Sequence, residues 1–232
     1  MTKLNFSRNE FSEIFWKKIF NNGAVHLAQA KADIASNHGH FEALRQSARY
    51  NTGSIPLASA VSLVMIANYF KPSLIAEVGT FIGRSTFSLA LGSYLGGVKS
   101  PQIHTCDYSN DIELDFRPTF DGIQQYKLTS STEMLARLLK DNLSPEMYFL
   151  DGRLQDEDLH ILSNLTASNA IILLDDFEGI EKGVANAVKI GGYFKENFTI
   201  AYPPSETILR LFGLQGWCSV AALIPKGRIS WG

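Results

Sequence analysis

The order of apolar and polar positions divides the chain into a helical N-terminal part and a longer alternating part. Within 8–48, four apolar residues recur with the spacing of one helix face, and charged residues lie on the other side. Gly23 and Gly39 interrupt this segment, which predicts two or three short helices. The recurring apolar residues are Phe11, Ile14, Phe15 and Ile19.

From residue 74 onward, short apolar runs alternate with amphipathic stretches, which is typical of a mainly parallel sheet. The predicted strands are 74–78, 103–107, 125–128, 147–150, 170–174, 199–202 and 218–223. The predicted helices are 57–70, 85–95, 132–139, 156–164 and 180–190. We therefore expect an α/β, Rossmann-like fold: a seven-stranded, mostly parallel sheet flanked by helices, with an N-terminal helical segment or lid (1–50) before the main domain (51–232).

Composition narrows the functional classes. The 232 residues suffice for one large α/β domain with a sizeable core, and the formal net charge of −2 offers no basic surface for nucleic acid. The longest apolar stretch, 55–70, contains polar residues and is too short to span a bilayer comfortably, so no membrane association is expected. Only Cys106 and Cys218 could form a disulfide, and the N-terminus lacks an apolar signal core. These features predict a cytoplasmic protein.

The stretch 75–86, I-A-E-V-G-T-F-I-G-R-S-T, carries the clearest functional signal. It predicts a strand, a tight turn and a helix start, with Glu77 in the strand and Gly79 at the turn. A glycine lets backbone N–H groups approach a ligand, and a helix N-terminus offers unpaired donors. Gly79 and Gly83 do not have the G-x-G-x-x-G spacing of dinucleotide folds. Together with Ser85, the segment resembles the nucleoside-binding loop of class I S-adenosylmethionine-dependent methyltransferases.

Asp107 ends the second predicted strand, thirty positions after Glu77. In a nucleoside-binding βαβ unit, an acid at this place can accept hydrogen bonds from both ribose hydroxyls. The alternative is an aspartate that starts a turn with Tyr108 and Ser109. Both interpretations stay open here, and the neighbouring loop favours the ribose contact.

Three more acids follow strands: Asp151 ends one, and Asp175 and Asp176 end the next. The carboxyl ends of neighbouring parallel strands meet at one edge of a sheet, where ligands bind. Three carboxylates there would repel one another unless a positive group lies between them, and oxygen ligands suit a hard cation. The alternative is that each acid only caps a turn or a helix.

The run F-L-D-G followed by I-I-L-L-D-D resembles the metal-dependent O-methyltransferases of the catechol and caffeoyl-CoA type. An all-aspartate set also resembles the metal-dependent sugar O-methyltransferases of antibiotic pathways. The resemblance covers about 50–225 and implies a sheet whose last hairpin inserts one antiparallel strand. It implies that Asp151, Asp175 and Asp176 hold Mg²⁺ or a similar divalent ion, with Asp151 also counted as catalytic.

The same resemblance implies the cofactor contacts. Glu77, Gly79, Gly83 and Ser85 would surround the methionine end of S-adenosylmethionine, and Ser54 could join them at the carboxylate. Asp107 would hold the ribose. Two residues would border the adenine. The alternative is that they only cap the helix, because a capping box over 130–133 marks this helix start, and both roles can hold at once. These two residues are Ser131 and Thr132.

The chain departs from the catechol pattern at the position of the general base. Those enzymes have a lysine three residues after the first metal-binding aspartate, and this chain has Leu154 there. Histidine is the natural alternative, because its pKa lies near neutrality. His38 and His40, in the turn-rich N-terminal segment, could reach over the site and act as the base.

Taken together, the sequence predicts an S-adenosylmethionine-dependent O-methyltransferase acting on a small hydroxylated molecule, aromatic or sugar, with divalent-metal assistance. A metal-independent methyltransferase and a non-catalytic S-adenosylmethionine-binding protein are the alternatives; a nicotinamide dehydrogenase is disfavoured. Phe11 and Trp16, interpreted as exposed, would suit a homodimer. The aromatic residues that could line the acceptor pocket are Tyr50, Tyr108, Phe177, Tyr202 and Trp217.

Overall fold

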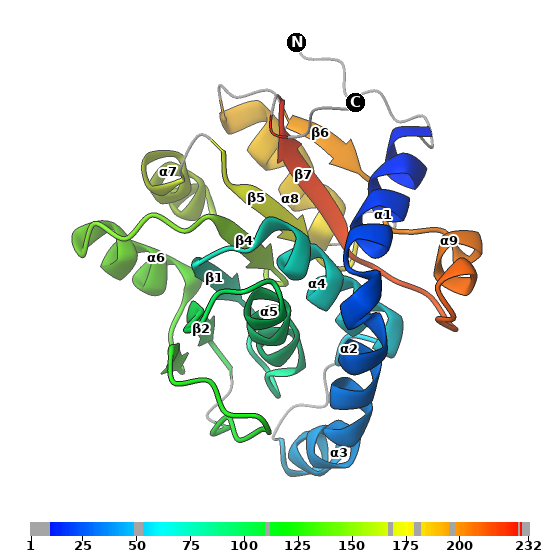
Figure 1. The fold of residues 1–232 in the computed structure, drawn as a ribbon. Coiled ribbons are helices and arrows are strands. Elements are labelled where there is room, and N and C mark those ends of the chain that lie inside the picture. Colours follow the sequence, from blue (N-terminus) through cyan, green and yellow to red (C-terminus); the bar gives the residue numbers. More distant parts are fainter. Residues whose placement is uncertain are drawn as a thin grey trace.

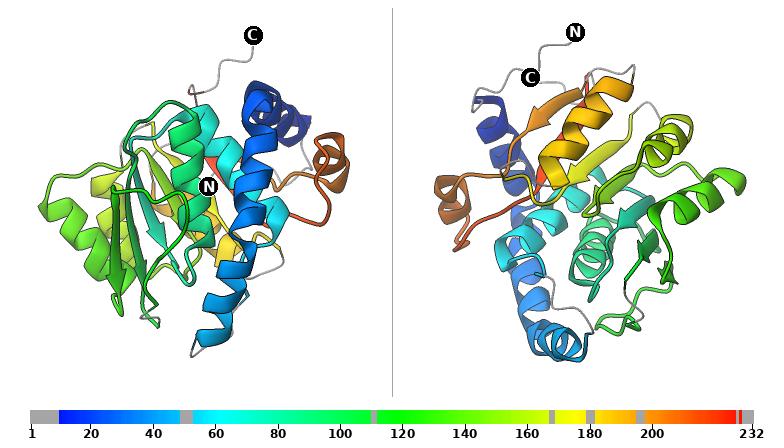
Figure 2. Two further views of the ribbon diagram at one scale, coloured as in Figure 1. Left: turned by 60° about the horizontal axis from the view of Figure 1, so that its bottom comes forward. Right: turned by 180° about the vertical axis from the view of Figure 1, so that it is seen from behind.

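The computed structural model describes residues 10–48, 53–109, 112–166, 169–178, 182–194, 198–226 and 228. In this part of the chain, a seven-stranded sheet lies between two layers of helices (Figures 1 and 2). The strands are β1 (Leu74–Val78), β2 (Gln102–Asp107), β3 (Ile123–Lys127), β4 (Met147–Leu150), β5 (Ile171–Leu174), β6 (Phe198–Ala201) and β7 (Ala221–Pro225). The predicted α/β fold with seven strands is confirmed.

The sheet has the order β3-β2-β1-β4-β5-β7-β6. β1 to β5 pair in parallel, whereas β7 is antiparallel to both β5 and β6, which confirms the expected inserted strand. The strand order changes direction between β1 and β4, because β2 lies on one side of β1 and β4 on the other. Ligands of open α/β sheets bind at the carboxyl ends of the strands at such a switch point. This edge of the sheet is where the site should lie.

The two faces of the sheet are covered by different helices. One face packs against α4 (Leu57–Phe70) and α5 (Arg84–Leu95), with α1 (Glu10–Asn22), α2 (Ala24–Ser36), α3 (His38–Ser47) and α9 (Glu206–Leu211) around them. The other face packs against α6 (Ser131–Lys140), α7 (Asp156–Leu165) and α8 (Lys182–Tyr193). No helix of the described residues is both long and apolar enough to cross a membrane.

The N-terminal helices share the core of the sheet. The Trp16 side chain is fully buried, and its indole N–H donates to the Tyr202 carbonyl over 2.6 Å. The Tyr202 N–H in turn donates to the Ser12 hydroxyl over 2.9 Å. The interpretation of Trp16 as exposed is therefore wrong, because its indole is buried and bonded within the chain. A homodimer stays a prediction. The domain division at residue 50 stays a prediction, but α1 packs into the same core as β6.

Most element boundaries follow the hydrophobic pattern, and the exceptions have local causes. The second break in the N-terminal helices falls at Asn37, and Gly39 lies inside α3. β7 begins at Ala221, three residues later than predicted, although the preceding residues are buried. The short helix α9 was not predicted; its start is marked by Ser205, whose hydroxyl accepts from the Ile208 N–H. The segment 179–181, in which the predicted helix 180–190 begins, lies outside the described residues.

Candidate functional site

The loop after β1 is shaped by two glycines with positive φ. Gly79 has φ +101°, and Gly83, which precedes α5, has φ +77°. A Cβ added at Gly79 would lie 3.1 Å from the Asp151 Cβ and 3.3 Å from the Asp151 backbone. The ends of β1 and β4 therefore approach each other as closely as their backbones allow. Only glycine adopts this geometry without strain.

A small hollow opens beside this loop at the switch point of the sheet. Ser54, Gly79, Ser85 and Asp151 all border it, so the structure brings together four of the residues that the sequence assigned to the methionine end and the acid site. Arg84 also lines this hollow. The hollow has a volume of only about 10 Å³, and the assignment of these residues to a cofactor stays a prediction.

Glu77 is fully buried behind this loop. Its Oε2 accepts a hydrogen bond of 2.5 Å from the Thr86 hydroxyl, whereas Oε1 has no partner among the described residues. Burial raises the pKa of Glu77 to about 7, although the nearby hydroxyl groups of Ser85, Thr105 and Thr86 oppose the rise. A buried oxygen without a donor is costly. This orphaned acceptor fits a polar or cationic group of a bound cofactor.

Asp107 makes the hydrogen bonds of a turn, as the alternative to a ribose contact predicted. Its Oδ1 accepts from the Ser109 N–H over 2.9 Å and its Oδ2 from the Phe81 N–H over 2.8 Å. Oδ1 also accepts from the Ser109 hydroxyl over 3.1 Å, so the open acceptor position is on Oδ2. The carboxylate lies at the carboxyl end of β2, beside the loop after β1, so the turn contacts leave a ribose contact geometrically open.

The residues proposed to border the adenine have a structural role. The Ser131 hydroxyl donates to Asp158 Oδ2 over 2.9 Å and the Thr132 hydroxyl to Asp158 Oδ1 over 2.6 Å, which joins α6 to α7. The predicted capping box of Ser130 and Glu133 is present at the start of α6. With both hydroxyl hydrogens directed at Asp158, these two oxygens could contact an adenine only as acceptors.

The acids that follow β4 and β5 meet a lysine that the sequence analysis did not identify. The Lys182 ammonium donates to Asp151 Oδ1 over 2.7 Å and to the Asp151 carbonyl over 3.1 Å. It also lies 2.9 Å from Asp176 Oδ2. The predicted convergence of these acids is therefore observed for two of them, with a protein cation between them.

Asp175 makes a different contact. Its Oδ1 accepts a hydrogen bond of 2.5 Å from the buried Ser219 hydroxyl, and the Ser219 N–H donates to the Ser59 hydroxyl. Within the described residues, no group of three or more His, Cys, Asp or Glu side chains is arranged to hold a metal ion. The donor set thus does not fit the divalent ion expected at Asp151, Asp175 and Asp176, and metal binding stays a prediction without support from this geometry.

Burial and neighbouring charges shift the pKa values of the residues in this cluster. Burial raises the pKa of the Asp151 carboxyl, and the nearby Asp175 charge raises it further. Burial also raises the pKa of Asp175. For Lys182, burial alone would lower the pKa, but the charge of Asp151 and the hydrogen bonds to Asp151 and Asp176 outweigh burial and raise it. Lys182 therefore stays protonated, and its positive charge stabilises the ionised carboxylate of Asp151.

The two histidines proposed as bases lie on α3. His38 is exposed and His40 is half-buried, and among the described contacts neither bonds to Asp151, Asp175 or Asp176. Leu154, at the position of the catechol-type lysine, is buried in the core. The arrangement gives no geometric support to a histidine base, and the role stays a prediction.

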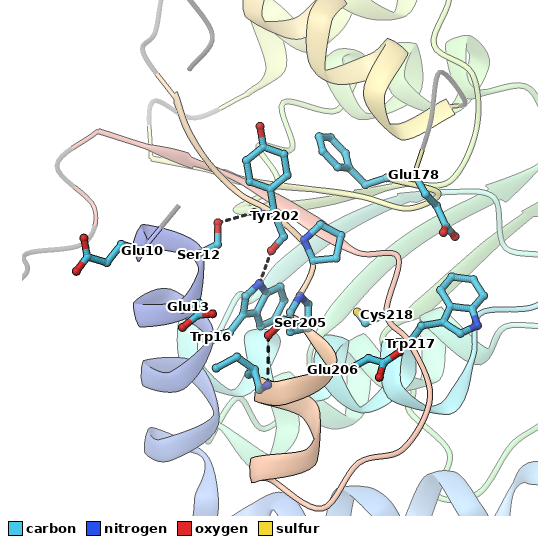
Figure 3. Close-up of a pocket in the computed structure, with 14 residues that line it drawn as sticks. Glu10, Ser12, Glu13, Trp16, Glu178, Tyr202, Ser205, Glu206, Trp217 and Cys218 are labelled. Carbon is cyan, nitrogen blue, oxygen red and sulfur yellow. Dashed lines mark hydrogen bonds between the residues drawn. The ribbon is translucent and has the colours of Figure 1, made fainter. Parts of the chain in front are cut away.

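A larger pocket lies beside the acid cluster (Figure 3). It has a volume of about 410 Å³ and is bordered by α1, the segments around α9 and the residues that follow β5. Figure 3 shows Glu178 and Trp217 on one side of it and Glu10 and Glu13 of α1 on the other. Its lining residues are Glu10, Ser12, Glu13, Trp16, Phe177, Glu178, Tyr202, Pro203, Pro204, Ser205, Glu206, Ile208, Trp217 and Cys218. Phe177, Tyr202 and Trp217 were expected to line an acceptor pocket; Tyr108 is exposed elsewhere, and Tyr50 lies outside the described residues.

The pocket is connected to the acid cluster through the backbone. The Phe177 N–H donates to the Ser219 carbonyl over 3.0 Å, and Cys218 directly precedes Ser219. Asp175 and Asp176 directly precede Phe177. The walls of the pocket are therefore the immediate chain neighbours of the carboxylates at the end of β5.

Comparisons with known proteins show the fold. Neither protein-family models nor curated proteins match the chain. Among solved structures, it is similar to an O-methyltransferase of tomaymycin synthesis from Streptomyces achromogenes, in complex with S-adenosylmethionine, at 16% identity (TM-score 0.55; 85% of this chain and 90% of the other). It is also similar to an O-methyltransferase from Bacillus cereus, in complex with S-adenosylhomocysteine, at 13% identity (TM-score 0.53; 93% and 99%). The chain has the Rossmann-like fold of class I methyltransferases.

Proposed function

We propose that this protein transfers a methyl group from S-adenosylmethionine to a hydroxyl of a small molecule. The proposal rests on the arrangement of Gly79, Asp151 and Glu77 at the switch point of the sheet. There, Gly79 lies against Asp151 with a positive φ at which a Cβ would be strained, and the buried Glu77 carboxylate keeps one oxygen without a donor. The similar structures from Streptomyces achromogenes and Bacillus cereus were solved with the cofactor and its demethylated product, which supports the same use of the fold here.

The chemistry follows from this placement. When bound, S-adenosylmethionine supplies an electrophilic methyl group: an acceptor oxygen lone pair forms the C–O bond as the S–C bond breaks, and the hydroxyl proton passes to water. The loop after β1 would hold the methionine end and Asp107 the ribose. Holding two reactants in line accounts for a large part of such accelerations. The chain's own residues would bind the two reactants and orient them.

The acceptor would lie in the pocket beside the acid cluster. At about 410 Å³ the pocket suits a small molecule, and its aromatic side chains offer flat apolar surfaces. Four glutamates line it, and none of its described lining residues is a lysine, arginine or histidine, although Glu13 and Glu206 pair with Lys17 and Arg210 outside the lining. Negative charge favours neutral or cationic acceptors, and cations also bind well over aromatic faces. We propose a neutral or positively charged hydroxylated acceptor, aromatic or sugar, and not a phosphorylated or coenzyme-A-linked one.

The acceptor proposal predicts a charge preference. Among hydroxylated aromatic compounds of equal size, those bearing an amine should be methylated with higher kcat/KM than those bearing a carboxylate. Glu178→Gln should reduce this preference by about fivefold, since two charges about 4 Å apart in water interact by about 1 kcal/mol. Glu157→Gln, an exposed residue on α7 across the sheet, is the matched control and should change nothing. A preference of the unmodified protein for anionic acceptors would contradict the proposal.

The ribose assignment predicts a second effect. Asp107→Ala should weaken binding of S-adenosylmethionine and S-adenosylhomocysteine to the same extent, because both carry the same ribose. The loss should be about 1.5–3 kcal/mol, the value of hydrogen bonds to a charged group, measured by titration calorimetry. Ser109→Ala removes one turn contact of Asp107 and keeps its carboxylate, so it should bind both ligands normally. If Ser109→Ala weakens binding as much as Asp107→Ala does, the loss of affinity comes from disruption of the turn, and the ribose contact is refuted.

A further inference from the structure

We infer that the Lys182 ammonium is a built-in cation that takes the place of the divalent metal at the ends of β4 and β5. The inference rests on side-chain geometry and does not depend on which molecule is methylated. It makes Lys182 a positioning residue that holds Asp151 and Asp176 together and keeps the site free of metal.

The three N–H groups of the ammonium match three acceptors. They are Asp151 Oδ1 at 2.7 Å, the Asp151 carbonyl at 3.1 Å and Asp176 Oδ2 at 2.9 Å. An ammonium has three donors and no acceptor, so these contacts satisfy the lysine completely. The cation therefore lies between the carboxylates that the sequence pattern assigned to a metal, and a metal could enter only if this side chain left.

The backbone around Lys182 fixes its position. A Cβ on the next residue, Gly183, would lie 2.2 Å from the Asp175 carbonyl, so α8 approaches the end of β5 as closely as a glycine allows. One turn later, the Asn186 side chain donates to the Gly152 carbonyl over 2.7 Å and accepts from the Leu154 N–H over 3.1 Å. These contacts dock α8 against the segments that follow both strands. Lys182 is thereby held over the acids by its helix as well as by its charge.

Lys189 on the same helix shows what an ordinary lysine does here. Its ammonium donates to the Leu154 carbonyl and lies 3.6 Å from the exposed Asp156 carboxylate. Lys182, by contrast, contacts a carboxylate whose side chain is only 20% exposed. Removing Lys182 would leave Asp151 buried without a counter-charge, whereas removing Lys189 would not.

The inference predicts that Lys182→Ala creates a metal site. This variant removes the cation and opens space beside Asp151 and Asp176, so that Mn²⁺ should bind at least about tenfold more tightly than to the unmodified protein. Binding is measured by electron paramagnetic resonance of free Mn²⁺ and by the rise in Tm when Mn²⁺ is added. Lys182→Arg keeps the charge and Lys189→Ala alters a remote lysine, so neither should gain Mn²⁺. Asp176→Asn in the Lys182→Ala background should remove the gain.

The result that would overturn the inference is Mn²⁺ binding by the unmodified protein at these acids with the affinity of the Lys182→Ala variant. A folded Lys182→Ala protein that gains no Mn²⁺ affinity would overturn it as well. If that variant does not fold, crystals of the unmodified protein soaked in Mn²⁺ decide. An anomalous scattering peak between Asp151 and Asp176 refutes the inference, and lysine density there without such a peak supports it.

Discussion

The Gly79→Val variant is expected to bind S-adenosylmethionine at least about 100-fold more weakly, a loss of about 2.7 kcal/mol or more. A Cβ at this position would lie 3.1 Å from the Asp151 Cβ, and a valine adds two methyl groups to it. The branched side chain would fill the space between the ends of β1 and β4, where the methionine end is proposed to bind. Titration calorimetry on the folded variant measures the loss.

Gly97→Val is the matched control for backbone strain. Gly97 has φ +103°, almost the value of Gly79, but nothing lies within 4 Å of an added Cβ. It follows α5, at the opposite end of that helix from the cofactor loop. Both variants should lose stability through strain of about 1–3 kcal/mol, but only Gly79→Val should lose binding. If both variants bind S-adenosylmethionine with equal affinity, the assignment of the loop after β1 to the cofactor site is contradicted.

Glu77 should make the free energy of unfolding depend on pH. Its pKa is raised by burial from 4.5 to about 7 in the folded protein, so the folded state holds this proton more tightly than the unfolded chain. The stabilising contribution is therefore fully present below about pH 4.5 and is lost as the pH rises through 7. A shift of this size corresponds to about 3 kcal/mol.

The measurement compares the unmodified protein with Glu77→Gln in urea unfolding between pH 4 and 8. The variant should lack the decline of about 3 kcal/mol, because an amide does not titrate. Glu133 gives a control of opposite sign: hydrogen bonds from Ser130 lower its pKa, so its contribution is lost as the pH falls. Parallel stability curves for the unmodified protein and Glu77→Gln would show that Glu77 does not titrate as described.

The fold could be predicted from local sequence patterns, because most helices and strands are indicated by their own residues. The buried four-residue runs of β4 and β5 and the capping box of Ser130 and Glu133 need no tertiary information. The meeting of Asp151 with Asp176 was also predictable, since the ends of neighbouring parallel strands share an edge. The sequence even indicated that a positive charge must lie among these acids.

Which cation this is could not be predicted. Lys182 reaches the acids because Gly183 and Asn186 dock α8 against the ends of two strands, and that docking depends on tertiary contacts. The spacing from Asp176 to Lys182 carries no recognisable motif. A lysine close to the start of a predicted helix was the available signal, because positive charge is unfavourable at a helix N-terminus unless acids compensate it.

The hydrogen bond from Trp16 to Tyr202 also has a consequence for synthesis on the ribosome. The two residues are 186 positions apart, so α1 emerges long before its carbonyl partner exists. At about 5–20 residues per second, the ribosome needs about 10–40 s to produce that partner. During this interval α4 can cover part of the apolar face of α1, but the indole N–H of Trp16 has no acceptor until Tyr202 has been synthesised. Nascent chains stalled before residue 202 should consequently expose this face to chaperones and proteases, and release should protect it.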